Sequence, residues 1–92
     1  MATTKPPPDH FTILYFAAAA SFSKKPHEHL RAPLPVSDLY QHLDKLYPGI
    51  KDKVLDSSAL TVNLDYVDIE DVADRTIQAG DEVAIIPPVS SG

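Results

Sequence analysis

GDEVAIIPPVSSG, the sequence of residues 80–92, places a turn, a short strand and a strand stop in succession. The pair Gly80-Asp81 favours a tight turn. The run from Glu82 to Ile86 is mostly apolar on both faces, which is typical of a strand that is buried on both sides of a sheet. Pro87 and Pro88 cannot donate backbone hydrogen bonds to a neighbouring strand, so we predict that the strand ends before them.

A second strand of this kind is expected near the start of the chain, in FTILYF at residues 11–16. The segment is rich in β-branched and aromatic residues, and both of its faces are largely apolar. It should therefore also be a central strand. We predict that these two strands lie side by side and parallel in the middle of one sheet, joined by a long crossover. The residues on the two faces of the first strand are Phe11, Ile13 and Tyr15, and Thr12, Leu14 and Phe16.

A helix is predicted in PVSDLYQHLDKLYPG, residues 35–49. Ser37 stands where an N-cap would accept free backbone N–H groups, and Asp38 in the first turn favours the helix dipole. Pro48 and Gly49 supply a stop. The apolar side chains recur at helical spacing and are expected in the core, at Val36, Leu39, Leu43 and Leu46.

Two further segments complete the expected sheet. AAAASFSKKPHEH, residues 17–29, turns from small to polar residues and is predicted to be an exposed loop before an edge strand at about His29 to Leu34. ALTVNLDYVDI, residues 59–69, has the alternation of a strand and should turn near Asn63 to Asp65.

The fold class that follows is α+β, with a mixed sheet packed on one main helix. The chain has 92 residues and no internal repeat, so one domain is expected. We predict a flexible, proline-containing N-terminal tail at residues 1–9, a folded domain at residues 10–88 and an extended functional tail at residues 89–92.

Composition excludes several classes of function. The sequence has no cysteine, which removes disulfides, thiolate metal sites and side-chain sulfur carriage. A formal charge of −5 has the wrong sign for binding nucleic acid. The first ten residues lack the apolar core of a signal peptide, and the apolar run from Phe16 to Ala20 is too short to span a bilayer. We therefore expect no membrane association, and the cytosol as the compartment.

Two segments together resemble one known family. ILYFA at residues 13–17, followed by GDEVAIIPPVSSG at the end of the chain, is similar to the small, sulfur-carrying subunit of molybdopterin synthase. That family has the ubiquitin-like β-grasp fold. The resemblance extends over nearly all of residues 11–92, and the closing segment is its specific part.

The resemblance implies a function for the last residue. In the family, an activating enzyme similar to those that charge ubiquitin uses ATP to adenylate the terminal glycine, here Gly92, so that AMP is attached transiently. A sulfur donor then converts the carboxylate to a thiocarboxylate, which donates sulfur to cyclic pyranopterin monophosphate inside the large synthase subunit. The resemblance implies that the chain binds no resident cofactor and catalyses no reaction alone. It would be the sulfur-donating subunit of a heterotetrameric sulfurtransferase.

The tail and the contact residues follow from the same resemblance. Members commonly end in Gly-Gly, whereas this chain ends in Ser91-Gly92, so the fit of the tail in a narrow channel depends on a small hydroxymethyl group. Apolar side chains that would contact the large subunit are Phe16, Tyr66 and Ile86. The residues expected to position the tail are Pro87, Pro88, Val89, Ser90 and Ser91.

Alternatives remain open at the level of sequence. A carrier for thiamine or tRNA thiolation, a protein-conjugating modifier, or a non-covalent ubiquitin-like binding module would have a similar fold. His27 and His29 lack an evident third ligand, so no metal is expected. A run of acidic residues between Asp65 and Glu82 is either a solvated face or a surface that steers the chain toward a basic enzyme.

Overall fold

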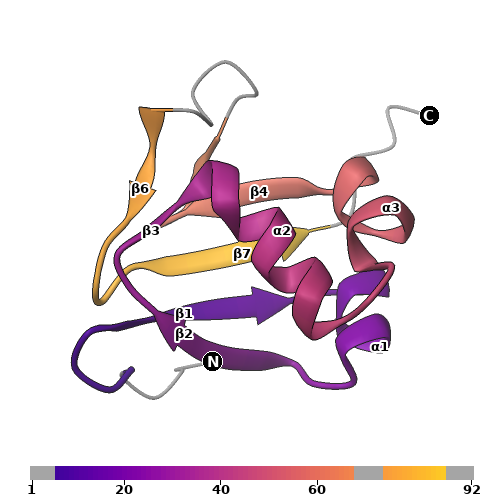
Figure 1. The fold of residues 1–92 in the computed structure, drawn as a ribbon, viewed down its shortest axis with the longest axis horizontal. Helices are drawn as coiled ribbons and strands as arrows, with labels where there is room; N and C mark the ends of the chain where they lie inside the picture. Colours follow the sequence, from indigo (N-terminus) through magenta and orange to yellow (C-terminus); the bar gives the residue numbers. More distant parts are fainter. Residues whose placement is uncertain (1–5, 68–73, 87–92) are drawn as a thin grey trace.

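A computed structural model of the chain describes residues 6–67 and 74–86. Within these ranges one mixed sheet carries the strands in the order β2-β1-β7-β4-β5, and a second, two-stranded sheet pairs β3 with β6 (Figure 1). The strands are β1 (His10–Tyr15), β2 (His27–Arg31), β3 (Leu34–Pro35), β4 (Ala59–Val62), β5 (Asp65–Tyr66), β6 (Thr76–Ile77) and β7 (Glu82–Ile86). The predicted α+β class is confirmed.

The centre of the main sheet is the parallel pair β1 and β7. Its register aligns Thr12 with Glu82 and Tyr15 with Ile85. On its other side β7 pairs antiparallel with β4, and β1 pairs antiparallel with β2. The parallel central pair and the bounds of the last strand are both as predicted. The expectation that the last strand is buried on both sides is wrong, because α2 covers one face of the sheet and alternate residues of β7 are only partly buried on the other.

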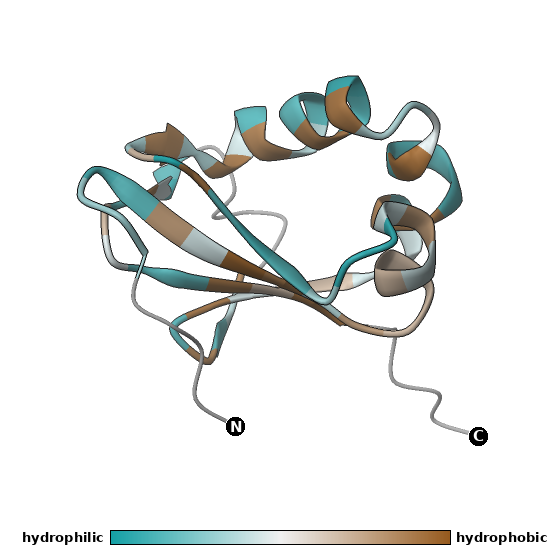
Figure 2. Cartoon of the chain, turned by 90° about the horizontal axis from the view of Figure 1, so that it is seen from below, coloured by the Kyte–Doolittle hydropathy of each residue, from teal (hydrophilic) through white to brown (hydrophobic). Residues whose placement is uncertain are grey.

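Helix α2 (Val36–Leu46) lies across one face of the sheet (Figures 1 and 2). Leu39 and Leu43 are fully buried beneath it, whereas Leu46 is 45% exposed, so the prediction that Leu46 belongs to the core is wrong. The predicted cap at Ser37 is also wrong, because Pro35 occupies the N-cap position without a side-chain hydrogen bond. Proline fixes its own backbone angle near the value that a helix start requires.

The segment predicted as a loop after β1 contains a short helix, α1 (Ala18–Ser23), with Ala19 and Ser23 buried. The next strand, β2, therefore begins at His27 and ends at Arg31, earlier than the predicted span of residues 29–34. Pro33 has no N–H to donate to a ladder. Leu34 and Pro35 instead form β3, which pairs with β6.

Between α2 and β4 the chain forms a short helix, α3 (Ile50–Lys53), and a 3-10 turn, η1 (Leu55–Ser57). Ile50, Val54 and Leu55 are buried and fill the end of the core. Strands β4 and β5 are joined by a two-residue turn at Asn63 and Leu64, as predicted. No helix within residues 6–67 and 74–86 is long and apolar enough to cross a membrane.

Replacing Leu43 with alanine is expected to lower the free energy of unfolding by about 2 to 5 kcal/mol, because the side chain is fully buried and a cavity would remain. Leu46→Ala is the matched control on the same helix. The Leu46 side chain is 45% exposed, so Leu46→Ala should lower the free energy of unfolding much less than Leu43→Ala does. Urea denaturation of both variants measures the difference, and equal losses would show that Leu43 is not part of the core.

Candidate functional site

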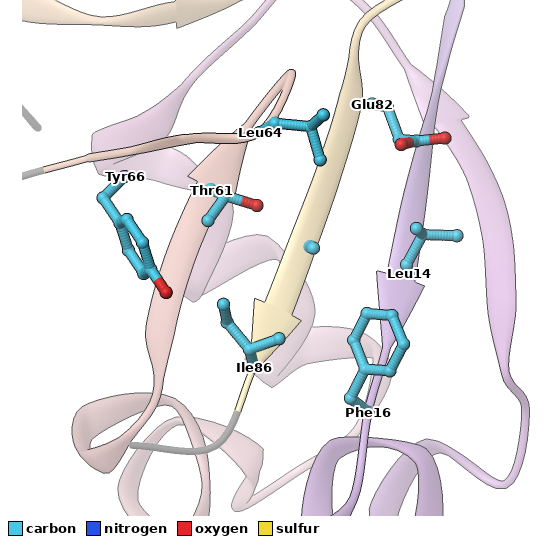
Figure 3. A pocket seen from close by; sticks show the side chains of 8 residues that line it. Leu14, Phe16, Thr61, Leu64, Tyr66, Glu82 and Ile86 are labelled. Carbon is cyan, nitrogen blue, oxygen red and sulfur yellow. The ribbon is translucent and has the colours of Figure 1, made fainter. Parts of the chain in front are cut away.

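The main sheet has two unlike faces, because successive side chains of a strand point to opposite sides. On β1, Phe11, Ile13 and Tyr15 are buried on the face that α2 covers. Leu14 and Phe16 point to the other face, which we call the open face. Its residues line a shallow hollow of about 300 Å³ and are Leu14, Phe16, Thr61, Leu64, Tyr66, Glu82, Ala84 and Ile86 (Figure 3).

Phe16, Tyr66 and Ile86, which the sequence singled out as contact residues, lie together on the open face. They come from three separate parts of the chain: Phe16 directly follows β1, Tyr66 lies in β5, and Ile86 ends β7. Phe16 is 45% exposed and Tyr66 is 61% exposed. A cluster of exposed apolar side chains is typical of a surface that binds another protein. That they contact a partner stays a prediction.

The structure adds residues to this surface that the sequence reasoning missed. Leu64 belongs to the turn between β4 and β5 and lines the hollow with its side chain exposed. The sequence predicts a turn near Asn63 to Asp65, but no surface role was predicted for Leu64. The signal that could have identified it is Asn63, because asparagine favours the first position of a two-residue hairpin turn and places the next residue at its tip. Leu14, Thr61 and Ala84 form the floor between the strands.

The last described residue of the chain lies on the open face. Ile86 is the last residue of β7 and also lines the hollow. The predicted carrier residue, Gly92, lies outside the described residues. The predicted tail-positioning residues also lie outside them: Pro87, Pro88, Val89, Ser90 and Ser91. Their roles therefore remain predictions.

Hydrogen bonds fix one end of the hollow. The Asn63 side-chain Nδ2 donates to Asp81 Oδ1 over 3.1 Å, and Asn63 Oδ1 accepts from the backbone N–H of Glu82 over 2.9 Å. These bonds join the β4–β5 turn to the start of β7. The acidic run was interpreted as either a solvated face or a steering surface. Its residues Asp65, Asp74, Asp81 and Glu82 are described, and Asp68, Glu70 and Asp71 lie outside the described residues.

A polar cluster supports the other end of the sheet, on the helix-covered face. The hydroxyls of Tyr15 and Tyr47 both donate to Glu28 Oε2, the latter over 2.6 Å. Lys25 Nζ lies 3.4 Å from Glu28 Oε1. Burial by itself raises the pKa of Glu28, but the two tyrosine hydrogen bonds and Lys25 outweigh it and hold that pKa below its usual value. The pKa of Tyr15 is raised, first by burial and then by its bond to Glu28.

The lowered pKa of Glu28 predicts a pH dependence of stability. Its contribution should be complete above the pKa of an unfolded glutamate, about 4.3, and should be lost as the pH falls through the lower folded value. Glu28→Gln should therefore be less stable than the parent at about pH 7, and the difference should shrink toward about pH 3. Thermal unfolding across this range measures it. The control, Asp56→Asn, removes an exposed pair with Lys51 and should change little.

No group of three histidine, aspartate or glutamate side chains within residues 6–67 and 74–86 is placed to hold a metal ion. His27 and His29 are neighbours on β2, with ring centroids 6.3 Å apart. The two rings are therefore adjacent without a third ligand of this kind among the described residues.

Comparison with known proteins identifies the family. The model of the ThiS family matches residues 13–92, which include all of the open face and the tail. The chain belongs to the ThiS family. A curated protein of Phaeosphaeria nodorum, named molybdopterin synthase sulfur carrier subunit, is 60% identical over 96 residues, covering 100% of both chains.

Solved structures agree with this assignment of the fold. A putative molybdopterin converting factor, subunit 1, from Pyrococcus furiosus is 26% identical, has a TM-score of 0.73, and is matched over 87% of this chain and 98% of that one. A chain in a complex of subunits 1 and 2 of molybdopterin-converting factor from Helicobacter pylori is 19% identical, with a TM-score of 0.63 and coverage of 90% and 99%. The predicted ubiquitin-like β-grasp fold is confirmed for this ThiS-family chain.

Proposed function

We propose that this chain is the sulfur carrier subunit of a molybdopterin synthase and that Gly92 is its carrier group. The observation that carries the proposal is the identity of 60%, over the full length of both chains, to a protein named for that role. The apolar open face includes Ile86, the last described residue before the predicted tail, and would give the chain a surface for holding a partner while the tail reaches into that partner.

The chemistry takes place on the C-terminal carboxylate. Attack of a carboxylate oxygen on the α-phosphate of ATP forms an acyl-adenylate and releases pyrophosphate. A donor that supplies sulfur at the oxidation level of sulfide then displaces AMP and leaves a thiocarboxylate. When the sulfur passes to cyclic pyranopterin monophosphate, water restores the carboxylate, so the carrier is regenerated. The absence of cysteine is compatible with this scheme, because the backbone itself carries the sulfur.

Two protein partners follow from the scheme. The large synthase subunit would dock against the open face, where Phe16 and Tyr66 offer exposed apolar area. An activating enzyme of the kind that charges ubiquitin would bind ATP and the tail. Glycine at the end of the tail leaves the reacting carbonyl carbon unshielded. The cytosol is the compartment in which we expect these encounters.

The first test is the intact mass of the purified chain after incubation with the activating enzyme, ATP and a sulfur donor. The expected result is exchange of one carboxylate oxygen for sulfur, in a reaction that requires ATP. An unchanged mass with an enzyme that is active on another carrier would contradict the proposal. Copurification separates the alternatives, since a tRNA thiolation enzyme in place of a synthase large subunit would indicate a different carrier.

A further inference from the structure

The turn between β4 and β5 contains an unusual residue at its tip. Asn63 and Leu64 both have positive φ angles, 52° and 73°. A two-residue hairpin turn with two positive φ angles is normally built from Asn-Gly, because a side chain in this region meets its own backbone. Asparagine is tolerated there, and its side chain is bound to Asp81 and Glu82. Leucine at the second position has no such explanation within the turn.

The leucine side chain also contributes little to the folded domain. It is 85% exposed, the largest exposed fraction among the large apolar residues of the described chain. A glycine at this position would relieve the backbone and a polar residue would be better solvated. Leu64 therefore lowers the stability of the free domain through its backbone conformation, and its side chain, which is exposed, returns almost no stabilisation by burial.

The position of Leu64 on the open face indicates a role in binding a partner. The hollow runs along β7 from Glu82 to Ile86, and Figure 3 places Leu64 beside its Glu82 end and Phe16 at the opposite end. The last described residue, Ile86, lies at the same end as Phe16. A partner that contacted only that end could pivot about it. A second apolar contact at the far end of the hollow would fix the direction in which the tail enters.

We infer that Leu64 is a contact residue of the large synthase subunit, and that it sets the orientation of docking by inserting into an apolar pocket of that partner. This inference rests on the proposed function. The partner surface it requires has two separated apolar contacts, one for the Phe16 end of the hollow and one for a single aliphatic side chain at the β4–β5 turn. The turn is suited to this role because the bonds of Asn63 hold it against β7.

The test compares the affinity for the large subunit with the stability of the free chain. Leu64→Asn and Leu64→Gly should weaken the Kd by about 10- to 100-fold, as expected for loss of an anchor side chain. Their Tm should not fall, and that of Leu64→Gly should rise by up to about 6 °C. Leu64→Met, which keeps an apolar side chain, should retain affinity to within about threefold. Isothermal titration calorimetry and thermal unfolding provide the two readouts.

The control is Leu46→Asn, which removes a half-exposed leucine on α2 and should leave the Kd unchanged. An unchanged Kd for both Leu64 variants, while Tyr66→Asp loses binding, would overturn this inference and leave the proposed docking face intact. An unchanged Kd for Tyr66→Asp as well would overturn the docking face itself. Equal loss in the Leu46 control would also overturn the inference, because the effect would not be specific to the open face.

Discussion

Removing Gly92 is expected to abolish sulfur transfer while leaving the affinity for the large subunit within about threefold of the parent. The acyl-adenylate and thiocarboxylate require a carboxylate at the position that the activating enzyme and the synthase reach. Without Gly92 the terminal carboxylate belongs to Ser91 and lies about 3.5 Å short of the reacting groups of both enzymes. Because a misplacement of about 1 Å can already cost about 100-fold in rate, the shortened chain should not react. Single-turnover formation of molybdopterin with the purified large subunit is the measurement.

Ser91→Gly is the matched control for the tail, because it keeps the length and removes only the hydroxymethyl group. It should be charged and should transfer sulfur at least as fast as the parent, since a slimmer residue meets less resistance in a narrow channel. Undiminished transfer by the chain without Gly92 would contradict a carrier role for that residue. Loss of partner affinity in the same chain would instead indicate that Gly92 contributes to binding.

Tyr66→Asp is expected to weaken binding of the large subunit by about 100-fold or more. The change removes a large apolar side chain that is 61% exposed on the open face and places a charge where the partner would exclude water. Burial of an unpaired carboxylate costs several kcal/mol, and about 2.7 kcal/mol corresponds to 100-fold in Kd. Titration calorimetry with the large subunit measures the loss.

Leu46→Asp is the control for added charge, because Leu46 is a half-exposed apolar residue on α2 and not on the open face. It should bind the large subunit as the parent does. A circular dichroism spectrum of Tyr66→Asp that matches the parent would show that the fold is retained. Parent-like affinity in a folded Tyr66→Asp variant would mean that the partner docks elsewhere.

The central strands of the sheet were predictable from sequence because their residues are mostly apolar. FTILYF and EVAII are apolar on both faces, which favours a central strand, although the structure leaves Leu14, Phe16 and Ile86 on the open face. The pairing at the turn after Val62 was predictable because Asn63 favours a hairpin. Phe16, Tyr66 and Ile86 were assigned to one surface through resemblance to a family, and the structure brings them together.

The errors have local physical causes. Helix α1 was missed because Ala18–Ser23 is too short to show an apolar periodicity. Ser37 was assigned as a cap because its residue type suits that role, but the N-cap is Pro35, two residues earlier. Leu64 could not be recognised as a surface residue by its type. The hairpin signal of Asn63, and not the residue type of Leu64, indicates that this side chain lies at the tip of a turn, where it is exposed.

The placement of β7 between β1 and β4 has a consequence for the order of events in folding. The pairs β1–β2 and β4–β5 each join neighbouring parts of the chain and should form quickly. The β1–β7 pair joins residues as far apart in sequence as Thr12 and Glu82, so it should form later. Until that late step, both local hairpins expose an unpaired apolar edge where the missing strand belongs. We therefore expect the partly formed sheet to be the species most prone to self-association during refolding, because the addition of β7 covers the inner edges of β1 and β4 and completes the open face.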